Sequence, residues 1–392
     1  MHKQALHKVV IVGGGPVGSV LALALQQQQV PFTMLEARAQ GASHHDTRAL
    51  ALSYGSRLIL EKLGVWQAVA ARATAINTIH ISQRGGLGRT KLNAADHGLE
   101  SLGYVLPYGA LTQALDAVLH ANHIIYQAEA IEIKPAQDAS SVTYMHFNVM
   151  QTLKSALLVV ADGGRSLGEI EGIVKVTKAY GHDALVTKVR AELPHNHIAY
   201  ERFTPAGPMA LLPNGDTGFS LVWTGLQANI HALLALNDKT FLARLHQAFG
   251  DRVGQFLSVE KRMSFPLKLS TLKPSVALHL ASLHLAIIGN AAQTLHPVAG
   301  QGFNVGMRDA WTLADLIINA PQSELGSAAM LANYTQLRGR DTRGGILFTD
   351  LLVKVFNNDV VGLNTLRGTG LGLLELFKPA KNLLISKMSF GK

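Results

Sequence analysis

The sequence predicts an α/β protein in which a Rossmann-like domain, discontinuous along the chain, carries an inserted and mainly antiparallel β-sheet domain and is followed by a C-terminal helical segment. Three observations lead to this prediction. A glycine-rich turn lies between two apolar segments near the N-terminus, alternating segments fill the middle of the chain, and a second glycine-rich turn follows an apolar segment near residue 288. The length of 392 residues agrees with two intimately joined domains.

The N-terminal turn has the spacing of a dinucleotide fingerprint. A short apolar segment precedes Gly13-Gly14-Gly15-Pro16-Val17-Gly18, and a helical stretch leads to a second strand that ends at Glu36. Gly13 permits the tight turn, Gly15 lets the backbone approach a pyrophosphate, and Gly18 allows close packing of helix and strand. The Glu36 carboxylate can accept hydrogen bonds from an adenosine ribose. Because an acid disfavours a 2′-phosphate at this point, the motif favours FAD or NAD over NADP.

A further turn follows the apolar segment Leu157–Val160, which runs into Ala161-Asp162-Gly163-Gly164. A strand that ends in Asp-Gly at the carboxyl edge of a sheet can face a ligand crevice. The same dipeptide is common in ordinary turns. Taken by itself, the segment is compatible with both interpretations and favours the ordinary turn slightly.

The middle of the chain has the pattern of a β-sheet domain. Its segments alternate and are bounded by turns, which indicates mainly antiparallel strands; they are Ala184–Ala191, Ile198–Phe203, Met209–Pro213 and Phe219–Thr224. The apolar segment Leu283–Ile288 then returns to the first sheet. We therefore expect a nucleotide-binding domain at 1–176 and 276–345, a substrate domain at 177–275, and a helical segment at 346–392.

The second glycine-rich turn lies in residues 289–306, which read Gly-Asn-Ala-Ala-Gln-Thr-Leu-His-Pro-Val-Ala-Gly-Gln-Gly-Phe-Asn-Val-Gly. A helical pattern continues at Met307–Ile318. A strand, a proline-kinked turn and a Gly-Gln-Gly helix start place backbone N–H groups where they can face an anion. A plain helix N-terminus is the alternative interpretation.

Composition limits the classes of function. The formal net charge is +9, but lysines and arginines form no dense block, so we expect no nucleic-acid partner. The absence of cysteine excludes disulfides, thiolate metal sites and cysteine nucleophiles, and we expect no metal. The glycine motif lies inside the N-terminal apolar stretch, which argues against a cleaved signal and against a transmembrane helix. We expect a cytoplasmic protein.

The segment 346–392 combines apolar helical patterns with positive charge. It contains six lysines and arginines and three acidic residues, a net charge of +3. Basic, apolar helices of this kind can lie in a membrane interface. The alternatives are a helical pair packed on the protein's own core and a contact between subunits. The segment is therefore a candidate for peripheral contact with the inner face of the membrane.

Three separated elements together resemble the class A flavoprotein monooxygenases, the para-hydroxybenzoate hydroxylase-like group; they are the glycine motif with Glu36, Asp162-Gly163 and Gly289–Gly302. Two segments look like the ubiquinone-biosynthesis hydroxylases within that group; they are Asp46-Thr47-Arg48-Ala49-Leu50-Ala51-Leu52 and Gly289–Gly306. Others are similar to the members that act on 2-polyprenyl-6-methoxyphenol; they are Glu201-Arg202-Phe203-Thr204, Gly207-Pro208 and Leu366–Pro379. The resemblance covers almost the whole chain.

The resemblance implies FAD as cofactor, with its adenosine on the glycine motif and Glu36, and NAD(P)H as electron donor. It places Arg48 near the flavin or its phosphates, and Asp162 near the pyrophosphate and the NAD(P)H route. Another group of residues would face the flavin ring, and these are Pro297, Gly300, Gln301 and Gly302. Amides at such a helix start can stabilise negative charge on the reduced flavin.

The chain departs from the resembled pattern at two points. Most of the wider family has Asp where this chain has Asn290, which keeps hydrogen bonding to the ribitol but loses the charge. The arginine that usually follows the serine is missing after Ser166, which leaves the choice between NADPH and NADH open.

Three further residues are candidates for catalysis or substrate contact. His296 lies beside the expected ring site, where an imidazole can assist phenol deprotonation, with a hydrogen-bonded structural role as the alternative. Tyr200 and Arg202 are candidates for the substrate side, with buried packing and a surface ion pair as the respective alternatives.

The activity implied by the resemblance is hydroxylation of a polyprenylated phenol of the 2-polyprenyl-6-methoxyphenol type in ubiquinone biosynthesis. O2 would react as a flavin C4a-hydroperoxide, so that the cofactor performs the difficult chemistry. Two other functions remain: a flavin-dependent reductase of isoprenoid lipids, and a non-catalytic flavoprotein scaffold of a quinone-synthesis complex. A homo-oligomer or membership of such a complex is also compatible with the sequence.

Overall fold

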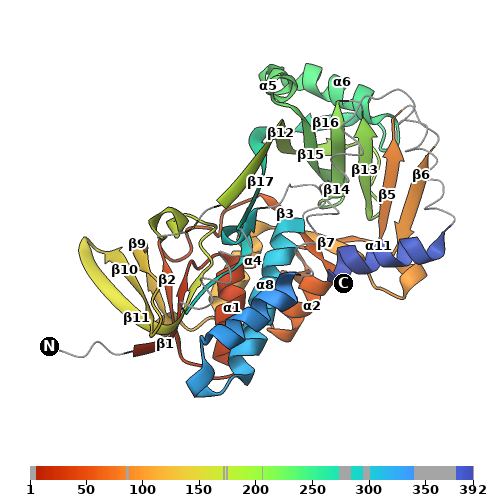
Figure 1. Ribbon diagram of the computed structural model, residues 1–392. Helices are drawn as coiled ribbons and strands as arrows, with labels where there is room; N and C mark the ends of the chain where they lie inside the picture. Colours follow the sequence, from red (N-terminus) through yellow and green to blue (C-terminus); the bar gives the residue numbers. More distant parts are fainter. Residues whose placement is uncertain are drawn as a thin grey trace.

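The computed structural model describes residues 6–84, 88–170, 173, 175–204, 206–272, 284–294, 301–339 and 377–391. These residues form a mixed α/β architecture with a seven-stranded, a nine-stranded and a three-stranded sheet, which we call the first, second and third sheet (Figure 1). The predicted fold class is confirmed.

The first sheet has the strand order β8-β2-β1-β11-β10-β9, and β18 pairs with β11. The strands are β1 (Leu6–Val12), β2 (Phe32–Glu36), β8 (Ile124–Tyr126), β9 (Ala128–Lys134), β10 (Ser140–His146), β11 (Val149–Val160) and β18 (Leu285–Ile287). β1 lies between β2 and β11 and is parallel to both. The late strand β18 returns to β11 in parallel register. The first sheet is therefore discontinuous along the chain, as the sequence predicted.

The second sheet has the order β19-β17-β12-β15-β14-β13-β5-β6, with β16 also paired to β12. Its strands are β5 (Thr78–Gln83), β6 (Arg89–Asn93), β12 (Lys175–Ala191), β13 (Ile198–Thr204), β14 (Gly207–Pro213), β15 (Gly218–Leu226), β16 (Phe256–Val259), β17 (Met263–Leu272) and β19 (Gln293–Thr294). Only the β13–β5 pair is parallel among these described strands. The mainly antiparallel character is as predicted, but β5 and β6 come from the chain before residue 177.

The helices cover both large sheets (Figure 1). Their bounds are α1 (Pro16–Gln27), α2 (Tyr54–Lys62), α3 (Trp66–Ala70), α4 (Tyr108–Val118), α5 (Gln227–Ala235), α6 (Asp238–Phe249), α8 (Gln301–Asn319) and α11 (Lys378–Phe390). The third sheet is β3 (Ala49–Ser53), β7 (Gly103–Pro107) and β4 (Thr74–Ile76), in the order β3-β7-β4. Helix α1 is buried on most of its surface because the first sheet, α4 and α8 surround it. One apolar core joins the first and third sheets to α1, α2, α3, α4 and α8, whereas α5 and α6 pack with the second sheet in a separate core.

Most of the segment 346–392 lies outside the described residues. Its described end forms α11, which packs through Ile385 against Leu92 and Leu102. Phe377 and Leu383 remain exposed there. Within the described part of the chain, no helix is long and apolar enough to cross a membrane.

Helix α8 is tied to its neighbours by buried polar side chains. The Asn304 side chain accepts hydrogen bonds from the Ser53 amide and the Ser56 hydroxyl, both at 2.8 Å, and donates to the Ala51 carbonyl at 2.9 Å. Asp309, only 2% exposed, accepts from the Arg338 guanidinium at 2.6 Å. The other Asp309 oxygen accepts from the Gly289 amide at 3.1 Å. These bonds fix α8 relative to β3 and to the turn after β18.

Arg338→Met should destabilise the protein strongly, because it leaves the Asp309 carboxylate buried without its cationic partner. The expected loss in the free energy of unfolding is about 3–5 kcal/mol, measured by urea-induced unfolding. The matched surface variant Arg244→Met on α6 should change this free energy by less than about 0.5 kcal/mol. If both variants lost the same small amount, the ion pair would not anchor α8.

Candidate functional site

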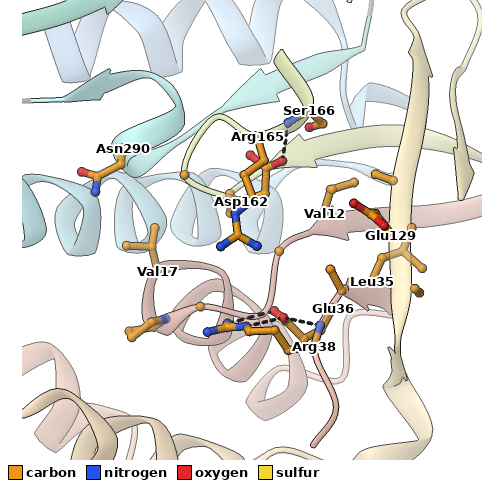
Figure 2. A pocket seen from close by; sticks show the side chains of 18 of the residues that line it. Val12, Val17, Leu35, Glu36, Arg38, Glu129, Asp162, Arg165, Ser166 and Asn290 are labelled. Carbon is orange, nitrogen blue, oxygen red and sulfur yellow. Dashed lines mark hydrogen bonds and ion pairs between the residues drawn. The ribbon is translucent and has the colours of Figure 1, made fainter. Parts of the chain in front are cut away.

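A cavity of about 690 Å³ lies at the carboxyl ends of β1, β2 and β11. The turn before α1, the start of α8 and strand β9 complete its wall (Figure 2). Seven of the residues that the sequence predicted to bind cofactor line it, and these are Gly13, Gly15, Glu36, Arg48, Asp162, Asn290 and Gly302. Residues from distant parts of the chain thus meet in one cavity.

The three glycines of the first motif differ in what a Cβ atom would contact at each position. Gly13 has φ +108°, and a Cβ there would lie 2.7 Å from the Asp162 backbone. A Cβ on Gly18 would lie 2.0 Å from the Gly13 carbonyl oxygen, so its absence permits close helix–strand packing. Gly15 differs, because among the described residues a Cβ there would meet only the Tyr108 hydroxyl, at 3.9 Å. Gly15 thus leaves open space at the N-terminus of α1, where a ligand can approach the backbone.

Glu36 is buried at the end of β2, with 7% of its surface exposed. Its carboxylate accepts from the Gly14 amide at 2.7 Å and from the Arg38 guanidinium at 2.7 and 3.2 Å. Burial opposes the charged form, but the hydrogen bonds and charge of Arg38 and the Gly14 amide outweigh it and hold the pKa of Glu36 below its ordinary value. The carboxylate is therefore charged and fixed in place at neutral pH.

Arg48 is held by two neighbours. Asp46 accepts hydrogen bonds from its Nε and Nη2 atoms at 2.9 and 2.5 Å, and the guanidinium lies over the Tyr108 ring, 5.3 Å from the centroid. The hydrogen bonds to Asp46 raise the pKa of Arg48, despite partial burial. This arrangement presents a positioned positive charge at the wall of the cavity.

Asp162 serves a turn and the cavity at once. Its two carboxylate oxygens accept from the Gly164 and Ser166 amides, each at 2.8 Å, and so organise the turn into a short 3₁₀ helix at Ser166–Glu169. The residue also lines the cavity. The Asp-Gly sequence therefore forms a turn, and this turn lies at the wall of the cavity. Arg165, which follows in the same turn, adds a cation to the wall (Figure 2).

The second glycine-rich turn reaches the cavity from the other side. Asn290 and Gly302 line the wall. A Cβ on Gly306 would lie 2.9 Å from the Val17 side chain, so α8 can pack against α1 only because that residue is glycine. The first turns of α1 and α8 both contribute to the wall, and backbone N–H groups at helix starts favour anions. His296, Pro297 and Gly300 lie outside the described residues, as does the side chain of Gln301.

The structure does not bring Tyr200 and Arg202 to the cavity. Both lie on the face of β13 that packs against α6. The Tyr200 ring contacts the Phe249 ring edge-on at 5.4 Å, and Arg202 donates to the Ala248 carbonyl at 3.3 Å. On the opposite face, Ala199 packs against the third sheet. Alternation along a strand shows which side chains share a face but not which face meets a ligand, and this is why the sequence could not place them.

Sequence reasoning missed several residues of the wall. Arg38 follows Glu36 by two positions, a spacing that returns a side chain to the same side of an extended chain, and this could have been noticed. Tyr108, Glu129 and Arg165 also line the cavity. Because they belong to separate elements, no local pattern connects them with the glycine motif.

The residues present fit a dinucleotide. The cavity offers a buried carboxylate next to the end of β2, open space in front of the Gly15 backbone, two helix starts and the cations of Arg48 and Arg165. A carboxylate suits ribose hydroxyls, and helix starts with nearby arginines suit a pyrophosphate. At Gly15, a Cβ would meet no described atom closer than the Tyr108 hydroxyl at 3.9 Å.

A family model described as FAD binding domain matches residues 7–343. Two relatives align along nearly the whole chain. Ubiquinone hydroxylase UbiL of Rhodospirillum rubrum is 34% identical, covering 96% of this chain and 88% of its own. The 3-demethoxyubiquinol 3-hydroxylase of Escherichia coli is 30% identical and covers 94% of each chain. The chain therefore belongs to the FAD-binding family, and it is an FAD-dependent monooxygenase of the class that the sequence predicted.

Solved structures agree on the fold. The p-nitrophenol 4-monooxygenase PnpA of Pseudomonas putida superposes with a TM-score of 0.75 over 98% of each chain, at 15% identity. HpxO of Klebsiella pneumoniae, in complex with FAD and uric acid, gives a TM-score of 0.74 over 97% of this chain and 96% of its own, at 14% identity. Identities this low show a shared fold and no more.

Gly15→Ala and Gly18→Ala should separate cofactor binding from folding. The Gly15 φ of −67° suits alanine, and its Cβ would meet no atom of the described protein closer than 3.9 Å. We therefore expect Gly15→Ala to fold normally and to retain several-fold less FAD, because its methyl group occupies the space for the pyrophosphate. Gly18→Ala should instead lower the melting temperature. The measurements are flavin absorbance per protein and thermal unfolding. Full flavin occupancy in a folded Gly15→Ala variant would contradict this site.

Proposed function

We propose that this monooxygenase hydroxylates the ring of a polyprenylated phenol, of the 2-polyprenyl-6-methoxyphenol type, in ubiquinone biosynthesis. NAD(P)H is the proposed electron donor. In the overall reaction, one atom of O2 replaces a ring hydrogen as a hydroxyl group and the other leaves as water. NAD(P)H supplies the two electrons and, with one proton from solvent, balances the equation.

The observation that carries the proposal is the similarity to ubiquinone hydroxylases along nearly the whole chain. UbiL and the Escherichia coli hydroxylase each align over at least 94% of this chain at 30% identity or more. The human ubiquinone biosynthesis monooxygenase COQ6 aligns over 98% of it at 28% identity. Since the alignment includes the second sheet as well as the cavity, it supports a shared substrate class in addition to a shared cofactor.

Several residues of this chain would hold the cofactor. Glu36, fixed by Arg38, would accept hydrogen bonds from the adenosine ribose. The Gly15 amide at the start of α1 would bind the pyrophosphate, with Arg48 and Arg165 close by. Asn290 would bond the ribitol through its amide.

The flavin ring would lie toward the other side of the cavity. The start of α8 at Gly302 would face the ring and favour negative charge on it. Pro297 and Gly300 belong to the same proposed contact. When bound, FAD supplies the redox chemistry and the activation of oxygen.

A proton must leave the ring carbon or the phenol during hydroxylation. We assign the removal of this proton to His296, whose imidazole can accept a proton near neutral pH. Its place in the sequence, next to Pro297 and five residues before the first residue of α8, supports the assignment.

Product analysis under ¹⁸O2 tests the proposal. Purified enzyme with FAD, NAD(P)H and a short-chain 2-polyprenyl-6-methoxyphenol should yield a product heavier by one ¹⁸O atom, detected by mass spectrometry. A product heavier by two hydrogens, with no label, would show instead a reductase of isoprenoid lipids. Absence of NAD(P)H oxidation with every phenol would favour the scaffold function. A parallel assay with a 3-demethoxyubiquinol-type substrate shows which ring position the enzyme prefers.

We further propose that the C-terminal segment contacts the membrane surface, where a polyprenylated phenol resides. Phe377, the N-cap residue of α11, is 60% exposed, and Leu383 within the helix is 65% exposed. Lys381 and Lys387 belong to the same helix. Exposed apolar side chains beside lysines favour the interface of an anionic bilayer. Each lysine near such a surface contributes on the order of 1 kcal/mol, less at high salt.

Flotation with phosphatidylglycerol vesicles tests this contact. The FAD-loaded protein should float with the vesicles at low salt and release at high salt. Leu383→Glu should weaken flotation several-fold, because it replaces an exposed apolar group by a negative charge, which the anionic lipid repels. Leu257→Glu, at a leucine that is 51% exposed on β16, is the matched control and should bind normally. Equal binding by all three proteins would assign the exposed face of α11 to another contact.

A further inference from the structure

Cationic side chains gather on one face of the second sheet, where β13, β5 and β6 lie side by side at its edge (Figure 1). The register places Arg202 of β13 next to Ser82 of β5, and Ser82 opposite Arg89 of β6. Arg84 follows directly after the end of β5, and its charge acts on Arg202. This is the face that carries α6 further along the sheet, opposite to the one that packs against the third sheet.

A buried histidine lies on the same face, two residues before Ser82 in β5. His80 of β5 lies between Tyr200 of β13 and Lys91 of β6. Its side chain is only 6% exposed, and its ring meets the Tyr200 ring edge-on at 5.8 Å. Its Nδ1 atom is buried and has no hydrogen-bond partner among the described residues. A buried ring nitrogen without a partner is costly, which suggests that a ligand or ion completes its surroundings.

The charges around this histidine are all of one sign. Burial lowers the pKa of His80 to about 4, and the cations of Arg252, Lys91, Arg89 and Arg202 contribute in that order. Burial and the charges of Arg252 and Arg84 likewise lower the pKa of Arg202. Arg252 comes from the loop after α6, where it donates a long hydrogen bond of 3.5 Å to the Phe249 carbonyl.

Counter-charges are lacking in the described part of the chain. Arg84, Arg89, Arg202 and Arg252 form no ion pair with any described carboxylate. Among the described residues, the Arg202 guanidinium makes two long hydrogen bonds, to the Ala248 carbonyl at 3.3 Å and the Ser82 hydroxyl at 3.4 Å. Like charges on neighbouring strands destabilise a sheet. An anion bound between these guanidinium groups would remove that repulsion.

We propose that Arg84, Arg89, Arg202 and Arg252 form a binding site for a phosphate group, with His80 at its floor. Guanidinium groups match the oxygens of phosphate in geometry and charge, and several converging arginines suit a dianion better than a single carboxylate. None of these residues lines the FAD cavity. The site is therefore separate from the cofactor site and does not depend on the proposed hydroxylation. The phosphate can be a free phosphate compound or the headgroup of an anionic phospholipid.

Titration of the full-length, FAD-loaded protein with inorganic phosphate tests the site. At constant ionic strength, phosphate should shift the NMR signal of the His80 ring in a saturable way, and His80→Gln identifies that signal. Bound phosphate favours the imidazolium, so the pKa of His80 should rise. Arg252→Gln and Arg202→Gln should each weaken phosphate binding at least tenfold, measured by calorimetry. Arg244→Gln, at an exposed arginine on α6, is the matched control and should bind phosphate like the parent protein.

Flavin absorbance and melting temperature confirm that each variant is folded, and Arg252 is exposed enough for its variant to fold normally. Vesicles of phosphatidic acid in phosphatidylcholine distinguish the source of the phosphate. Vesicle binding that inorganic phosphate displaces identifies a lipid headgroup, whereas binding of inorganic phosphate without vesicle binding identifies a soluble compound. The proposal is overturned if phosphate produces no saturable change, or if Arg244→Gln weakens binding as much as Arg252→Gln.

Discussion

The close approach of backbone to backbone around the first glycine motif is the constraint on which the cofactor site depends. Helix α1 can pack closely against the end of β1 because Gly18 has no Cβ. A Cβ there would lie 2.0 Å from the Gly13 carbonyl oxygen. Helix α8 packs closely against α1 because Gly306 has no Cβ, which would lie 2.9 Å from the Val17 side chain. Both contacts bring helix starts to one cavity. A larger side chain at either glycine would move a helix start away from the ligand.

Buried polar bonds hold this arrangement against the rest of the molecule. Asn304 links α8 to the third sheet through Ser53 and Ala51, while Asp309 links α8 to the turn after β18. Such groups are costly when unpaired and specific when paired, so they select one placement of the helix. The shape of the cavity therefore depends also on Asn304 and Asp309, which do not line it. The apolar core supplies most of the driving force for folding, but these bonds set the register of α8.

Sequence reasoning succeeded where function depends on local backbone shape. Gly13, Gly15 and Glu36 form a pattern within one strand–helix–strand unit, and the spacing alone predicts their place at the end of β1 and β2. It failed where distant segments meet. The parallel pairing of β5 with β13 is a contact between residues more than 100 positions apart, which no local pattern reveals. The sequence likewise did not show that Tyr200 and Arg202 lie on the face of β13 that packs against α6, away from the cofactor cavity. Their contact with substrate stays a prediction.

The cofactor cavity and the proposed phosphate site at the edge of the second sheet favour anions by different physical means. In the cavity, helix starts and backbone amides near Gly15 act as fixed partial charges, which are partly shielded from solvent. At the edge, Arg89 and Arg252 are exposed full charges, and salt screens their attraction over about 8–10 Å at physiological strength. Binding at the cavity should thus depend on fit, and binding at the edge on ionic strength. The buried ring of His80, next to Arg202, marks one defined place for an anion among these otherwise exposed charges.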